Sequence, residues 1–140
     1  MEYKNNGSII AVRLERGEEI ISSLTNLASK EKIRFASVQG IGASDHTVIG
    51  VFDTNTKQYC RRELNVPMEI TNICGNISRK DGEPYLHLHI TLGDAEGNVY
   101  AGHLNECYIS VTSELVLQTV DIKTERLMDD SVGINLLHFH

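Results

Sequence analysis

The sequence predicts an α+β fold in which one amphipathic helix packs on a largely antiparallel sheet. The first observation is a single stretch, 18–32, in which apolar residues recur at helical spacing. The second is the rest of the chain, where β-rich segments of strand length alternate with turn formers. The third is that turns at 53–57 and 93–98 are short enough to join hairpin strands. The 140 residues fit one domain, so we expect a single domain over 1–140.

The N-terminal part of the chain supplies a strand and then the helix. Residues 1–7 are polar, and we expect them to be frayed. Residues 8–14 have the β-branched content of a first strand. Gly17 marks the change of period, and the helix that follows has acidic residues in its first turn and basic residues near its end, as the helix dipole favours. The sheet leaves room for a second, short helix elsewhere.

The next segments form a meander of strands. We expect strands at 34–39, 47–52 and 58–64, with the last two joined as a hairpin. Between the first two, Gly40–Ala43 lacks the third glycine and the following helix of a dinucleotide-binding loop. It therefore indicates a β-bulge or a close approach of two backbones.

A further strand is predicted at 66–77. Pro67 lies near its beginning, which suits a strand start or a sheet edge because proline has no N–H to donate. Alternation places the Glu69 side chain on the opposite face of the strand from Met68 and Ile70. If this strand pairs with the next one, that face is the one that carries the histidines described below. An exposed charge and a role near a ligand both fit Glu69.

The C-terminal third is also β-rich. Residues 107–120 form a run too long for one straight strand, so we expect it to bend or bulge. We expect 122–128 to continue the sheet and 133–140 to form a mobile tail. That tail contains His138 and His140, whose spacing alone does not indicate a second site.

The chain is organised around a strand at 85–92 that carries two histidines. Successive side chains of a strand point to opposite faces, so His87 and His89 share one face while the leucines between and around them share the other. The turn formers at 93–98 reverse the chain and bring His103 back toward the pair. The sequence therefore predicts that three histidines meet.

Such a cluster suggests a metal site. Neutral imidazoles are common zinc ligands, and three protein ligands with one open position are typical of catalytic rather than structural zinc. Cys107 is a weaker candidate for a fourth ligand, because alternation does not assign its face. The alternative is that the histidines line a polar face or an oligomer interface. No GxSxG motif supports nucleophilic catalysis.

Composition limits the partners. Lys and Arg total 13 against 19 Asp and Glu, and the net charge of −6 opposes binding to the phosphate backbone. The basic neighbours Arg61–Arg62 and Arg79–Lys80 are short and lack interleaved aromatic residues. Three cysteines without a CxxC motif indicate reduced, buried thiols. With no apolar run of membrane-spanning length and no secretory leader, we expect a cytoplasmic protein without a membrane partner.

Several motifs together resemble the plant and prokaryote conserved (PPC) domain. They are Arg13–Leu14, Gly17–Glu19, Gly40–Ala43, Gly75–Ser78, Gly82–Pro84, His87–Asp94, Gly97–Val99 and Gly102–Leu104. The resemblance spans nearly the whole chain. It implies an α/β domain on an antiparallel sheet that assembles into homotrimers. It also implies a metal, zinc or another divalent transition metal, held by the histidines that match His87, His89 and His103.

The resemblance leads to three functional hypotheses. The first is a stand-alone, homotrimeric metal-binding module that senses a small ligand or binds a protein partner. The second is a metal-dependent enzyme acting on a small molecule, with Glu69 as the candidate acid or base. The third is a DNA-associated regulator, because the family is often labelled as DNA-binding. The chain has no AT-hook, and Asn65–Ile70 retains only Glu69–Ile70 of the Gly-Arg-Phe-Glu-Ile-Leu interaction motif of the plant proteins, so direct DNA binding is the least supported.

Overall fold

The computed structural model describes residues 1–140, which form one helix and nine strands. The helix is α1 (Ile20–Lys30), and the strands are β1 (Glu2–Asn5), β2 (Ile9–Glu15), β3 (Phe35–Asp53), β4 (Gln58–Leu64), β5 (Met68–Lys80), β6 (Glu83–Gly93), β7 (Val99–Val120), β8 (Thr124–Asp129) and β9 (Ile134–Phe139). The predicted α+β class, with an antiparallel sheet and one main helix, is confirmed. The second, short helix does not form. With α1 only 11 residues long, no helix has the length to span a membrane.

Seven strands make the main sheet, in the order β1-β2-β7-β6-β5-β3-β4, and β7 also pairs with β3. Strand β7 reaches β6 through its first residues and β2 through its last ones, while β3 runs along its other edge. Both long strands are bulged, β3 between Gly40 and Gly42, as the glycines predict. A Cβ on Gly42 would lie 2.6 Å from the Thr112 carbonyl oxygen, so the segment is a close approach of two backbones.

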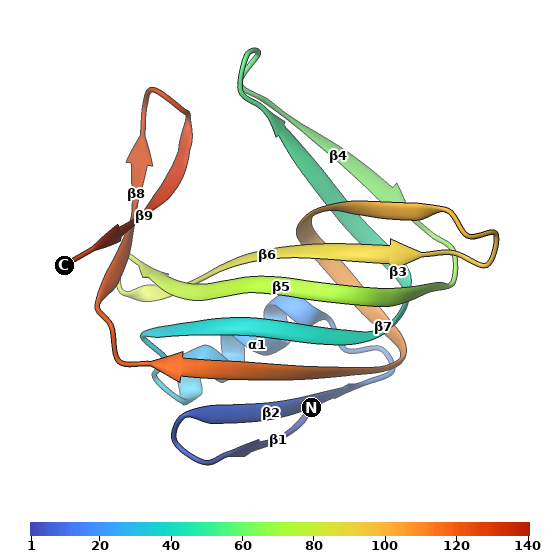
Figure 1. Cartoon of the computed structure of the whole chain (residues 1–140), viewed down its shortest axis with the longest axis horizontal. Coiled ribbons are helices and arrows are strands. Elements are labelled where there is room, and N and C mark those ends of the chain that lie inside the picture. Colours follow the sequence, from blue (N-terminus) through green and yellow to red (C-terminus); the bar gives the residue numbers. More distant parts are fainter.

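The core lies between α1 and one face of this sheet. The helix buries Ile20, Leu24, Leu27 and Ala28 on that face, and in Figure 1 it lies behind the long strands. Its N-terminus is fixed by Glu19, whose carboxylate accepts hydrogen bonds from helix amides and from the Cys107 amide of β7 at 3.1 Å. This cap contributes about 1 kcal/mol and ties the helix to the strand it covers.

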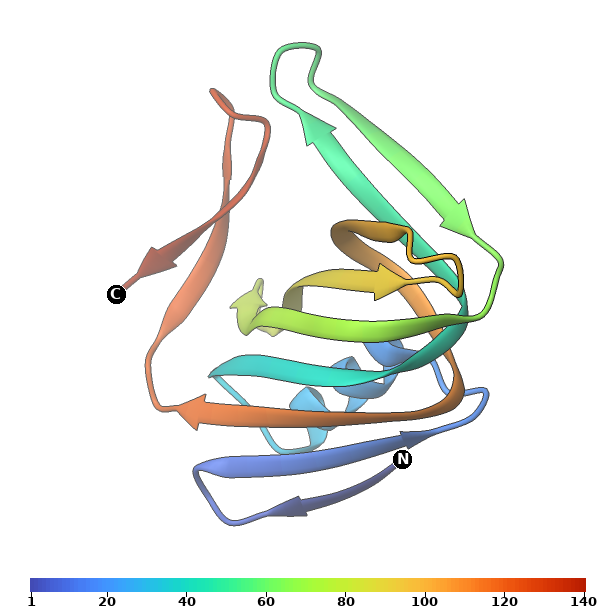
Figure 2. The same ribbon diagram turned by 45° about the vertical axis from the view of Figure 1, so that its right-hand side comes forward.

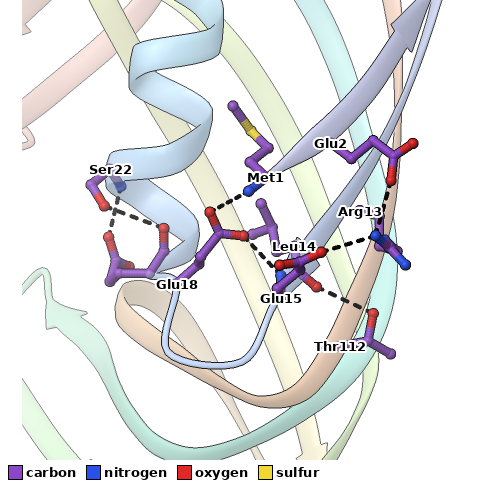
Figure 3. A network of polar contacts seen from close by, with 9 residues as sticks. Met1, Glu2, Arg13, Leu14, Glu15, Glu18, Ser22 and Thr112 are labelled. Atoms are coloured by element: carbon purple, nitrogen blue, oxygen red, sulfur yellow. Dashed lines mark hydrogen bonds and ion pairs between the residues drawn. The ribbon is translucent and has the colours of Figure 1, made fainter.

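The N-terminus is ordered, which corrects the expectation of a frayed segment 1–7. Strand β1 pairs with β2 in full register, from Glu2 opposite Arg13 to Asn5 opposite Ile10. Figure 3 shows that Glu18 accepts hydrogen bonds from the Met1 amino group and from the Glu15 amide at the end of β2, while Arg13 donates to the Glu2 carboxylate at 2.9 Å. The polar composition of residues 1–7 therefore reflects an exposed edge strand, which polar contacts with Arg13 and Glu18 hold in place.

The C-terminus corrects two further expectations. Residues 122–128 do not continue the main sheet, and 133–140 is not a mobile tail. Strands β8 and β9 instead pair with each other as a separate two-stranded sheet. In both Figure 1 and Figure 2 this hairpin stands at the end of β5 and β6, apart from the β3–β4 hairpin. Buried Thr124 and Arg126 anchor it, a pattern of polar residues that does not look like a core-facing strand in the sequence.

The pairing of β5 with β6 includes one very close approach. Gly75 has a φ of +152°, and a Cβ built on it would lie 2.0 Å from the His87 carbonyl oxygen. Only glycine fits at this point. The backbone of β6 beside the first histidine therefore depends on the absence of a side chain across from it.

We expect Gly75→Ala to lower the free energy of unfolding by about 2–4 kcal/mol, because strand β6 must move to admit the methyl group. Gly93→Ala is the matched control in the same strand pair, since its Cβ would meet only one atom, at 4.0 Å. It should change the free energy by less than about 0.5 kcal/mol. Urea unfolding measures both, and equal losses in the two variants would contradict this account of Gly75.

Candidate metal centre

Strands β6 and β7 bring the three predicted histidines together. Leu88, Ile90 and Leu92 of β6 are buried against the core, so His87 and His89 project from the opposite, open face of the sheet. Strand β7 returns beside β6 with His103 directly opposite His89. The intervening turn is closed by Asp94, whose carboxylate accepts hydrogen bonds from the amides of Glu96 and Asn98, as expected for a turn residue.

The three imidazole rings form a compact triangle. The ring centroids of His87 lie 5.3 Å from those of both His89 and His103, and the last two are 5.6 Å apart. One ring nitrogen from each histidine lies within 4.8 Å of the others. Tetrahedral zinc with Zn–N bonds of 2.0–2.1 Å requires nitrogens about 3.3 Å apart. Small ring rotations would close the triangle to that size, so the donor set fits such a metal.

Burial and neighbouring charges favour the neutral, metal-binding form of two of these donors, His87 and His103. Burial is the largest cause that lowers the pKa of His87, and together with the positive charges of Arg126 and of the neighbouring histidines it brings this pKa to about 4. Burial also lowers the pKa of His103, with a smaller contribution from His89. Both rings are therefore uncharged near neutral pH and can donate a lone pair.

Two residues that sequence reasoning did not identify flank His103. The ring of Tyr59, from β4, lies edge-on to it with centroids 6.2 Å apart. The Tyr59 hydroxyl and the Asn105 side chain exchange hydrogen bonds of 2.8–3.0 Å, and Asn105 also donates to the His103 carbonyl oxygen. Gly50 makes room for this ring, because a Cβ there would lie 2.0 Å from the Tyr59 hydroxyl. No local sequence pattern marks such a contact between distant strands.

Arg126 is a third neighbour that sequence reasoning missed. This residue comes from β8 and is only 5% exposed. Its Nη2 atom lies 3.5 Å from His87 Nδ1. Nε donates to the Ser78 hydroxyl at 3.1 Å and Nη2 to Asn76 Oδ1 at 2.8 Å. The guanidinium carbon lies 5.1 Å from the centre of the Tyr85 ring. Because 122–128 was expected in the main sheet, nothing placed this side chain beside the histidines.

Other candidates lie elsewhere. Glu69 is exposed and pairs with Gly93, so it is not part of the histidine cluster. Cys107 is buried in the core, where its sulfur accepts a hydrogen bond from the Thr47 hydroxyl. The expectation of buried thiols holds for this cysteine alone, because Cys60 and Cys74 are exposed. Neither histidine of the C-terminal hairpin joins the cluster.

A row of paired residues links the cluster to the far side of the sheet. The strand registers place Ala11, Val116, Gln39, Cys74 and His89 side by side on β2, β7, β3, β5 and β6. All five are exposed, so they share the open face. The histidines therefore stand at one end of a continuous surface that crosses the sheet.

The family model of the Plants and Prokaryotes Conserved (PCC) domain matches residues 1–121. Three similar solved structures cover nearly all of the chain. A "putative DNA binding protein" of Bacteroides thetaiotaomicron is 31% identical over 99% of this chain and 96% of its own, with a TM-score of 0.95. A metal-containing protein of Archaeoglobus fulgidus is 32% identical over 98% and 96%, with a TM-score of 0.87. A plant- and prokaryote-conserved protein of Pyrococcus horikoshii is 31% identical over 99% and 96%, with a TM-score of 0.85.

Curated relatives include the bifunctional protein GlmU of two Synechococcus strains. They are 27% and 28% identical to this chain over an alignment of 133 residues, and the match covers 93% of this chain. The same match covers 20% of each relative, so the chain spans about a fifth of the length of these proteins. The similarity thus concerns one segment of a much longer chain.

The depressed pKa of His87 predicts a pH effect in the metal-free protein. The unfolded chain takes up this proton near pH 6.5 and the folded chain only near pH 4, so the stabilisation that His87 contributes is lost as the pH falls through this window. In NMR titrations, Arg126→Met should raise the pKa of His87 but leave it below 6.5, because burial is the larger cause. The exposed Arg62→Met should not change it. An ordinary pKa for His87 in the wild type would refute the prediction.

Proposed function

Because the chain belongs to the Plants and Prokaryotes Conserved (PCC) domain family, we propose that it is a homotrimeric metal-binding module with a ligand-sensing or protein-interaction role. His87, His89 and His103 hold the metal, which is zinc or another divalent transition metal. The observation that carries the proposal is the triangle of ring nitrogens within 4.8 Å of one another. The Archaeoglobus relative, described as metal-containing, supports it.

The arrangement favours binding over catalysis. Three neutral imidazoles leave one position open on a tetrahedral metal, where an external ligand can bind. When bound, the metal supplies a Lewis-acid position for that ligand. An enzyme would also need a proton donor or acceptor beside this position, and Glu69, the candidate for that role, is paired with Gly93 outside the cluster. Sensing or partner binding needs only the open position.

The homotrimer would use the open face of the sheet. Ile41 of β3 is 56% exposed there and lines two adjoining hollows, one shared with Ala11 and Val116 and the other with Val111. Val111 and Val116 are 68% and 48% exposed. Contiguous exposed aliphatic side chains on a sheet face are typical of a surface that another subunit covers. We refer to Ala11, Ile41, Val111 and Val116 as the aliphatic patch.

DNA binding receives less support than metal binding. Relatives from Bacteroides and Ralstonia carry the description "putative DNA binding" in their names. This chain has a net charge of −6, which repels the phosphate backbone, and its adjacent basic residues occur only in pairs. We therefore keep DNA association as the weaker candidate.

We expect His87→Ala and His103→Ala to weaken zinc binding at least 10–100-fold, the range seen when only an outer partner of a ligand is lost. His46→Ala is the control, because its ring bonds Asn65 outside the cluster. Metal content and chelator competition on protein without a histidine tag measure the effect. The wild type and the control should hold one ion per chain. Unchanged zinc binding in His87→Ala would count against the metal site.

Charge in the aliphatic patch should break the trimer. Ile41→Asp and Val116→Asp place a carboxylate where a second subunit would exclude water, whereas Val99→Asp is a control at a more exposed valine outside the patch. Light scattering should give three times the 15.6 kDa chain mass for the wild type and the control, and a smaller mass for the patch variants. A monomeric wild type would contradict the assembly.

A further inference from the structure

The Arg126 guanidinium is a buried charge without a counter-ion. The residue is 5% exposed, and none of the ion pairs of the chain includes it. Its hydrogen-bond partners are a hydroxyl, an amide oxygen, a backbone carbonyl and, at 3.5 Å, the His87 ring, all of them neutral. Burying an unpaired charge is costly, so proteins rarely do it without a compensating group.

The guanidinium also has hydrogen-bond donors to spare. Of its five N–H groups, Nε uses one on Ser78, Nη2 one on Asn76 and Nη1 one on the Asn135 carbonyl oxygen, at 3.4 Å. One N–H of Nη1 has no partner, and the second N–H of Nη2 faces only His87 Nδ1, at 3.5 Å the longest of these contacts. Two terminal N–H groups are the fork with which arginine holds a planar oxyanion.

A bound metal would increase the positive charge that no negative group of the protein offsets. The proposed ligands are three neutral imidazoles, so a divalent ion would keep its full charge beside the positive Arg126. No aspartate or glutamate joins the cluster to offset either charge. Around this point, an otherwise acidic protein concentrates positive charge that an external anion would neutralise.

We propose that Arg126 and the open metal position beside His87 form a binding site for the carboxylate group of a small molecule. The inference rests on the proposed metal module and names the class of ligand that it recognises. A guanidinium matches the two oxygens of a planar carboxylate, and the acidic chain disfavours a phosphate dianion. Arg126 lies beyond residues 1–121, so the C-terminal hairpin, outside the segment that matches the family model, supplies this specificity.

The competing explanation is that Arg126 only ties the hairpin to the sheet. Its bonds to Ser78 and Asn76 join β8 to β5, and such a role would need no ligand. The two explanations differ in what they require of the unused N–H groups. A purely structural role requires no acceptor for these N–H groups outside the protein, whereas an anion site uses them to bind the anion.

Acetate is the probe, and NMR of the ¹⁵N-labelled full chain is the readout. The signals of the His87 ring and of the β6 amides are followed in zinc-loaded and metal-free protein at constant ionic strength. Acetamide serves as the neutral analogue of acetate, and inorganic phosphate as the competing oxyanion. The variants are Arg126→Met, Arg126→Lys and the control Arg62→Met, which removes another guanidinium stacked on a tyrosine.

We expect acetate to shift these signals saturably in the wild type and in Arg62→Met. Arg126→Met should weaken acetate binding at least tenfold, and Arg126→Lys less, because lysine keeps the charge but loses the fork. Equal acetate affinity in Arg126→Met and the wild type would overturn the inference. If Arg126→Met disorders the hairpin, unchanged acetate binding in Arg126→Lys would overturn it instead. Equal shifts with acetamide, or tighter binding of phosphate, would refute the carboxylate assignment.

The two proposals fail in different ways. One zinc per chain without any response to acetate would refute the carboxylate site and leave the metal module intact. Acetate shifts that depend on Arg126 in a chain that takes up no zinc would refute the metal module and retain Arg126 as an anion site.

Discussion

The backbone pairing of β6 with its two neighbours is the constraint on which the candidate site depends. Strand β7 places His103 opposite His89, and β5 approaches so closely at Gly75 that no side chain fits against the His87 carbonyl. The buried leucines of β6 fix which face the histidines occupy, because a one-residue slip would turn them into the core. Hydrophobic burial on one face thus holds the polar chemistry on the other.

Much of this could be predicted from the sequence. Alternation around His87 and His89, with turn formers before His103, is a local pattern, and the same holds for the helix and the β3–β4 hairpin. What the sequence did not reveal depends on contacts between distant segments. Strand β1 is ordered because of contacts with Glu18 and Arg13. The position of Arg126 depends on a hairpin whose polar residues do not form the apolar pattern of a core-facing strand. Tyr59 reaches His103 only because Gly50 has no side chain.

The residues of the candidate site come from two parts of the chain, the main sheet and the C-terminal hairpin. The histidines come from the sheet that the family model covers, while Arg126 arrives from β8 and lies over Asn76 and Ser78 of β5. Function in one fold can change at such neighbouring segments, because they alter the surroundings of a site and leave its scaffold intact. The donors and the buried charge beside them are therefore separable parts of the molecule.

The row of paired residues from Ala11 to His89 has a mechanical consequence. Its members are neighbours in one hydrogen-bonded ladder, which begins in the aliphatic patch and ends at the histidines. Backbone hydrogen bonds resist sliding between paired strands, so a displacement of β6 at the histidines would act on β5 first and through it on β3 and β7. In the proposed assembly, a metal at one end of this ladder and a subunit at the other would contact the same strands, and any coupling between the two would be reciprocal.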